Sequence, residues 1–220
     1  MGGQAGASGT GFVTVEGGIL RALQVLRVGQ AGGGAGRLEM VDALVATEGT
    51  YIAPNGVIAG TGKLVVGSLG LIIEGIMSPG INVQYPLASA AAHESTAQTQ
   101  DGTETLAITG TLTIGPTGRL AIPVTGSSPG QYGSLAVTGG ANLGGVLALD
   151  FRDGYAPRRG DTFTFLTATG GISGTFASVA INGLPPGFEY KLTTAGGQLK
   201  LEALNDGAPL RKVYLPLAAR

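Results

Sequence analysis

Apolar and small polar residues alternate along most of this chain, and one or two glycines close each short run. The pattern is clearest in TLAITGTLTIGPTGRLAIPVTG and in the YGSLAVTGGANLGGVLALDF that follows a few residues later. Because successive side chains of a strand point to opposite faces, a period of two predicts short strands. The Gly-Gly, Asn-Gly, Ser-Pro-Gly and Asp-Gly steps between the runs predict tight turns.

Strands are therefore expected in most of the chain, and helical periodicity is scarce. The predicted strands are Phe12–Val15, Arg37–Met40, Lys63–Val66, Leu106–Thr109, Thr111–Ile114, Arg119–Val124, Leu135–Thr138, Val146–Leu149, Thr162–Leu166, Phe188–Leu192 and Gln198–Leu204. The best helical candidate is Gly18–Arg27, although its second half also alternates as a strand would.

Strands this short and this frequent predict an all-β fold, namely a sandwich, a barrel or a solenoid. The segment 51–67 cycles between strand and turn about every six to seven residues, and aromatics make up only 5% of the chain. Aliphatic side chains suffice to fill a stack of strands, so both features favour a β-solenoid, or parallel β-helix. A jelly-roll-type β-sandwich in residues 105–204 is the alternative.

Four segments are expected along the chain. Residues 1–81 and 105–204 form N-terminal and C-terminal parts of the solenoid. Between them, residues 82–104 are polar and rich in alanine, which predicts a long loop that is either functional or a tolerated insertion. Residues 205–220 form a turn-rich linker followed by a detached terminal strand.

Composition adds a tendency to self-association. The chain is 43% hydrophobic, so it can bury a core, and its 41 glycines are best interpreted as turn residues. Charged residues make up only 12% and the net charge is −1, which gives little electrostatic protection against association. The same balance argues against a nucleic-acid partner. The longest apolar stretch, Leu69–Met77, is broken by Glu74, so no membrane span is expected.

Several motifs in order resemble the glycine-rich β-solenoid passenger regions of bacterial autotransporters. They are Asn55–Gly62, Ser78–Gly80, Gln131–Gly139, Ala141–Leu147, Gly160–Phe163 and Ile172–Phe176. The resemblance covers residues 51–204 and implies an exported, extracellular or cell-surface solenoid without the translocator domain. The family shares no catalytic residues, so none is implied here. Residues 1–11 lack the basic and apolar regions of a signal peptide, which indicates a cytoplasmic chain or a processed product.

Catalytic and metal chemistry find little support in the sequence. The chain has no cysteine, and its single histidine, His93, lies in the polar loop. Asp150, Asp153 and Asp161 are the one local group of carboxylates that could serve a glycosidase. They alternate with arginines, which is more typical of a salt-bridged turn. No catalytic residue, metal site or cofactor is predicted.

The terminal strand is the best candidate for a functional element. Val213, Tyr214, Leu215, Pro216 and Leu217 follow a flexible linker and are strand-like. Such a strand could pair with a neighbouring subunit, as in strand addition to an exposed sheet edge, or fold back onto its own chain. The sequence leaves these two options open.

The preferred hypothesis is a non-enzymatic extracellular structural protein. It would be a self-assembling subunit of a surface fibre, sheath or layer, whose partners are copies of itself, joined in one version by terminal-strand exchange. A monomeric adhesin or passenger fragment that binds a host surface or a glycan is the alternative. A polysaccharide-cleaving enzyme is the third.

Overall fold

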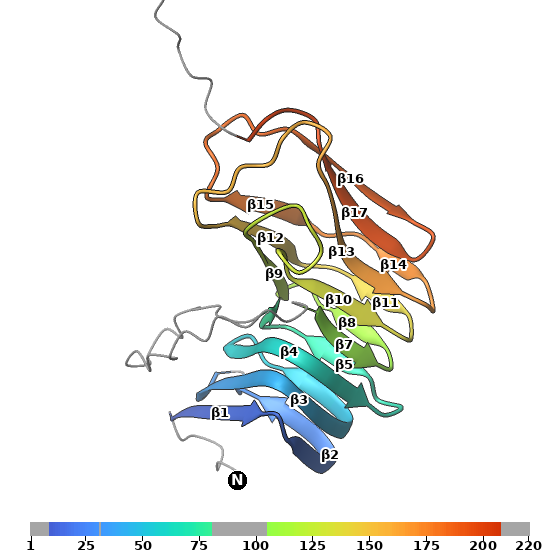
Figure 1. Cartoon of the computed structure of the whole chain (residues 1–220). Coiled ribbons are helices and arrows are strands. Elements are labelled where there is room, and N and C mark those ends of the chain that lie inside the picture. The colour runs from blue at the N-terminus through green and yellow to red at the C-terminus, as the bar shows by residue number, and fades with distance from the viewer. Residues whose placement is uncertain (1–8, 31, 81–104, 208–220) are drawn as a thin grey trace, which may run out of the picture.

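The computed structural model describes residues 9–30, 32–80 and 105–207, and within them the protein is all-β, with no helix (Figure 1). The prediction of an all-β protein is confirmed. The segment 18–27, the best helical candidate, falls largely within strand β2 (Ile19–Val28). Its pairing with a neighbouring strand along both halves accounts for that outcome.

The described residues form seventeen strands. They are β1 (Thr10–Glu16), β2 (Ile19–Val28), β3 (Ala35–Ile52), β4 (Gly56–Val66), β5 (Leu71–Ile73), β6 (Ile76–Pro79), β7 (Thr105–Thr109), β8 (Leu112–Ile114), β9 (Arg119–Val124), β10 (Ser134–Val137), β11 (Ala141–Leu143), β12 (Val146–Phe151), β13 (Thr162–Ala168), β14 (Ile172–Gly174), β15 (Ser178–Asn182), β16 (Tyr190–Ala195) and β17 (Gln198–Ala203). Most are as short as the sequence predicts, but β3 and β4 are long strands that bend.

The strands belong to one hydrogen-bonded sheet that wraps around a shared interior, and they stack in three parallel ladders (Figure 1). The first ladder runs β1–β3–β4–β6–β9–β12–β15. The second runs β2–β3–β4–β7–β10–β13, and the third runs β2–β3–β5–β8–β11–β14. From β7 to β12, each strand pairs with the strand three places further along the chain.

The parallel pairing does not fit the jelly-roll alternative for residues 105–204, which requires antiparallel strands. Antiparallel ladders occur only at the C-terminal end of the described chain, where β17 pairs with β13 and with β16. This β16–β17 hairpin continues the second ladder beyond β13. It therefore covers one of the three ladders at that end.

The bends between ladders use the turn residues that the sequence indicates. At the Pro-Asn-Gly step, the Asn55 side chain donates to the carbonyl oxygens of Gln30, Gly33 and Gly34 at 2.8–3.0 Å. Within β3, Asp42 adopts a positive φ of 48°, and its carboxylate accepts a hydrogen bond from the Thr61 hydroxyl. These contacts tie successive turns of the chain together.

Aliphatic side chains at equivalent positions stack into columns that form the core. One column of the first ladder consists of Val13, Leu38, Ile58, Met77, Leu120, Leu147 and Val179, each paired with the next. Its five middle members are buried. Each such side chain is covered by the strands on both sides of its own, which explains why so few aromatics are needed.

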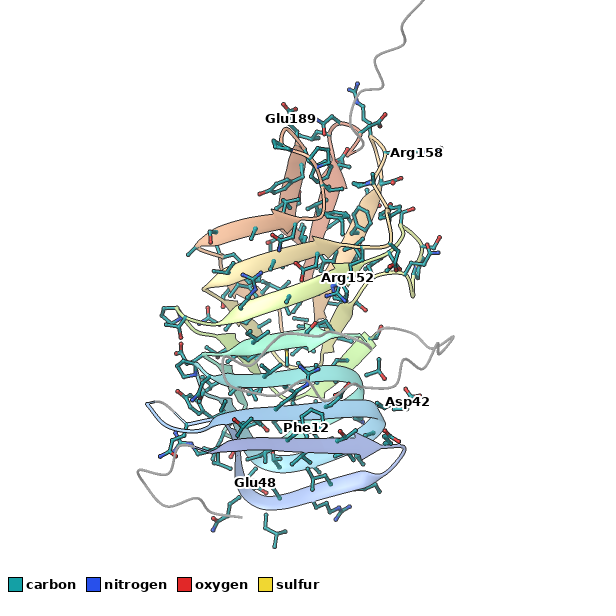
Figure 2. All side chains as sticks on the ribbon, turned by 90° about the vertical axis from the view of Figure 1, so that its left-hand side faces the viewer. Phe12, Asp42, Glu48, Arg152, Arg158 and Glu189 are labelled. Carbon is teal, nitrogen blue, oxygen red and sulfur yellow. The ribbon has the colours of Figure 1, made fainter. Side chains whose placement is uncertain are left out.

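Most of the described rings gather near the C-terminal end instead. The Phe163 and Phe165 rings stack with centroids 5.8 Å apart, and the Tyr132 ring meets both edge-on. Phe151 connects this group to Phe188, whose ring lies 5.8 Å away. Figure 2 shows the two ends of the stack, with Phe12 toward one end and Arg158 and Glu189 at the other. The aromatic group closes the C-terminal end of the core.

Candidate assembly edge

Among the described residues, the N-terminal end of the stack has no covering strand. Strands β1 and β2 each pair with β3 along one side, and no strand within the described ranges pairs with the other side of either (Figure 1). We call the outer side of β1 and β2, residues 10–16 and 19–28, the N-terminal edge. A strand edge of this kind presents a row of backbone N–H and C=O groups, which is a template for pairing with a further strand.

Core columns reach the surface at this edge. Val13 occupies the same column as Leu38 and Ile58, yet it is 49% exposed while they are 3% and 0% exposed. The residue types are equivalent, so the difference arises from position alone. None of the described strands covers Val13 on the side where its equivalents further along the stack are covered.

Exposed large apolar side chains concentrate at the N-terminal edge. Five of the eight among the described residues belong to β1 and β2: Phe12, Val13, Ile19, Leu23 and Val25. Leu23 is the extreme case, at 90% exposed. A concentration of exposed apolar side chains is typical of interaction sites.

Two arginines near the edge lie against aromatic rings. The Arg27 guanidinium lies over the Tyr51 ring, 4.9 Å from its centroid, and that of Arg37 lies 5.9 Å from the Phe12 centroid. Arg37 also forms an ion pair with Glu39 at 3.6 Å, and both side chains are nearly buried. Charged side chains on an edge oppose pairing with a further strand. Arg27 and Arg37 lie against rings, whereas Glu16 and Arg21 are exposed on β1 and β2 themselves.

The opposite end differs in its apolar surface. Strands β14 and β15 also have a single partner each among the described strands. However, neither carries a large apolar side chain that counts as exposed. Ile172, Val179 and Ile181 are half-buried and pack against the core, as do Leu184 and Phe188 from the loop beyond them. Among the described residues, this end therefore exposes fewer large apolar side chains than the N-terminal edge, Leu204 after β17 being 42% exposed.

Two sequence predictions fall outside the described residues. The candidate assembly strand, Val213, Tyr214, Leu215, Pro216 and Leu217, lies in 208–220, and the predicted loop 82–104 with His93 lies in 81–104. The structure describes neither segment. The N-terminal edge was not a predicted site, because nothing in the sequence of β1 distinguishes it from a strand inside the stack.

Asp150 and Asp161 take part in structural contacts, and Asp153 lies in a turn. Asp150 Oδ1 accepts a hydrogen bond of 2.6 Å from the Asn182 amide on the neighbouring strand. Asp161 Oδ2 accepts from the Tyr155 hydroxyl at 3.1 Å and from the Arg158 backbone N–H at 2.9 Å. Asp153 adopts a positive φ of 54° in a turn. Asp161, which completes an Arg-Gly-Asp tripeptide, thereby stabilises the turn that precedes β13.

Tyr155 gives this region a pH dependence. Burial, with a contribution from nearby Asp161, raises the pKa of the Tyr155 hydroxyl above its ordinary value of 10.0. The folded state thus favours the neutral phenol. The associated stability is present below pH 10 and is lost as the pH rises through the folded-state pKa. We expect Tyr155→Phe to lose less stability than the wild type above pH 10.

An ultraviolet titration measures this directly. The wild-type absorbance minus that of Tyr155→Phe isolates one phenolate, whose midpoint should lie higher in native protein than in denaturant. Equal midpoints in the two conditions would contradict the predicted shift.

A shallow open depression of about 320 Å³ lies on the outer face of the third ladder. Polar side chains reach it from three successive strands or the turns before them, namely Thr111, Thr113, Asn142 and Ser173. Its lining contains hydroxyl and amide groups and backbone, but no titratable side chain. The depression can form hydrogen bonds with a ligand, but its lining supplies no titratable acid or base.

Within the described ranges, no three His, Cys, Asp or Glu residues group closely enough to hold a metal ion. The described part of the chain also contains no helix of the length and apolarity that crossing a membrane requires. No protein-family model matches this chain, and no characterised protein matches it at a significant level.

Proposed function

We propose that this protein is a non-enzymatic structural β-solenoid, an extracellular subunit that self-assembles into a surface fibre, sheath or layer. The three parallel ladders support the solenoid part of the proposal. The resemblance to autotransporter passengers supports an extracellular or cell-surface location. Low charge and the absence of cysteine are compatible with dense packing of copies outside the cell.

The observation that carries the proposal is the exposure of core columns at the N-terminal edge. A position that is buried throughout the stack becomes half-exposed at Val13, and Ile19 and Leu23 add further apolar surface. Burying the exposed half of a Val, Leu or Ile side chain contributes on the order of 1 kcal/mol. The edge thus favours a contact that covers it.

Apolar burial alone gives weak association. The five exposed side chains of the edge together contribute only about 5 kcal/mol, whereas association costs about 4–15 kcal/mol in lost freedom. Backbone hydrogen bonds to the outer side of β1 and β2, which no described strand pairs with, would supply the remaining specificity and affinity. A stable contact at this edge is therefore expected to include strand pairing.

Charge placed on the edge should prevent assembly. We expect Ile19→Asp to weaken self-association at least tenfold, because a carboxylate buried in an apolar contact is strongly unfavourable. Leu69→Asp is the matched control, since Leu69 is 61% exposed and Ile19 64%, but Leu69 lies in the turn between β4 and β5.

Sedimentation velocity over a concentration series, with electron microscopy of the same samples, measures the outcome. Wild type and Leu69→Asp should assemble alike, while Ile19→Asp stays monomeric. A wild-type protein that is monomeric at every concentration would overturn the proposal.

A further inference from the structure

We propose that the β1 edge of one copy receives the segment Val213–Leu217 of another copy, which adds to the first ladder as an extra strand. The inference rests on the proposed function, since it names the partner of the same edge. It is carried by the pattern of the segment, by the distance it would have to cover, and by the difference between the two ends of the stack.

The alternation of side chains in Val213–Leu217 matches the columns of aliphatic side chains that end at β1. In a strand, Val213, Leu215 and Leu217 point to one face and Tyr214 and Pro216 to the other. Three aliphatic side chains at this spacing match the exposed end of the core, where β1 presents Val13 and Val15 inward.

Pro216 fits the same arrangement. Backbone groups of alternate residues point to opposite edges of a strand, so Val213, Leu215 and Leu217 can pair with β1 while Pro216 faces outward. Its missing N–H is then not needed by the ladder, and the outer edge is a poor template for a further strand. The added strand would cover the edge and end the stack.

The segment cannot cover the edge of its own chain. Six strand spacings of about 4.8 Å separate β1 from β15 in the first ladder, which is roughly 29 Å. Gly207 lies at the C-terminal end, where its backbone N–H donates to the Pro157 carbonyl oxygen at 2.8 Å. The six residues from Gly207 to Val213 span at most about 22 Å when extended. Pairing of Val213–Leu217 with β1 therefore occurs between copies.

The chain's own C-terminal end offers less to the segment. Strands β14 and β15 are within its reach, but their apolar side chains Ile172, Val179 and Ile181 are less exposed than Val13 and already pack against the core. At the N-terminal edge, by contrast, Val13 is about half exposed. The gain in buried apolar surface favours the edge of another copy.

A complementation experiment tests the inference. One variant lacks Leu210–Arg220 and keeps an intact edge, and the other carries Val13→Asp and keeps an intact segment. Each should be monomeric alone, and an equimolar mixture should form a heterodimer that grows no further, because only one donor and one acceptor remain. Leu69→Asp should assemble as the wild type does, and thermal melting followed by circular dichroism confirms that every variant is folded.

A fluorescent peptide of residues 208–220 gives a direct measurement. It should bind the truncated variant, and both Val13→Asp in the protein and Leu215→Asp in the peptide should weaken binding at least tenfold.

The other occupants of the edge give different results, and each overturns the inference. If the segment pairs within its own chain, truncation lowers the melting temperature and the mixture stays monomeric. If two edges pair with each other, the truncated variant still self-associates and Val13→Asp does not, with no rescue on mixing. If the wild type itself never associates, the proposed function fails before the partner strand is in question.

Discussion

Replacing Phe163 with alanine is expected to lower the free energy of unfolding by about 3–5 kcal/mol. Phe163 is fully buried in the aromatic group at the C-terminal end, where its ring contacts those of Tyr132, Phe151 and Phe165. Truncation removes the buried surface and leaves a cavity that the neighbouring rings, held on separate strands, can fill only in part. Denaturant unfolding followed by circular dichroism measures the loss.

Phe12→Ala is the matched control for this experiment. Its ring is 46% exposed at the N-terminal edge and lies under the Arg37 guanidinium, so a loss of about 1 kcal/mol is expected. Losses of equal size for the two variants would mean that the aromatic group does not stabilise the C-terminal end as described. The comparison separates a closed end of the stack from an open one.

Replacing Gly60 with alanine is expected to destabilise the protein by about 2–3 kcal/mol. Gly60 has a φ of 115°, which side-chain-bearing residues rarely adopt, and a Cβ at this position would meet the carbonyl oxygen of Met40 on the adjacent strand. The backbones of β3 and β4 would have to separate where they bend from the first ladder to the second.

Gly187→Ala separates the cost of the unusual φ from the cost of the clash between the added Cβ and the neighbouring strand. Gly187 has a similar φ of 102°, but an added Cβ would find nothing within 4 Å. Only the conformational cost remains there, and about 1 kcal/mol is expected. If chemical denaturation gives the same loss for both variants, the close approach of Gly60 to Met40 contributes nothing to stability.

Much of the fold follows from local pattern. The alternation in residues 146–149 and 162–166 predicts strands that the structure contains as β12 and β13, and the Pro-Asn-Gly step predicts the turn that Asn55 forms. These predictions succeed because side-chain alternation and turn chemistry are properties of a few consecutive residues.

Other elements depend on pairing. The strand β15, with sequence SVAIN, lies in no predicted segment, and it forms because β12 pairs with it over five residues. The sequence predicts only residues 37–40 of the long strand β3, because the bend at Asp42 interrupts the alternation of side chains. Pairing with β4 holds the residues before and after that bend in one strand. A predicted salt bridge around Asp161 was replaced, at its carboxylate, by hydrogen bonds to a backbone N–H and a phenol.

An all-β protein with glycine turns, low charge and a mainly aliphatic core can be predicted from the amino-acid sequence, because those properties are set by composition and by spacing over a few residues. Which strand ends the stack depends on the pairing of strands in the folded chain. Val13 and Leu38 are similar residues in similar alternating segments, and one is exposed because no described strand covers it. Burial is a property of neighbours that lie far apart along the chain, so the candidate assembly edge could be located only once the ladders were known.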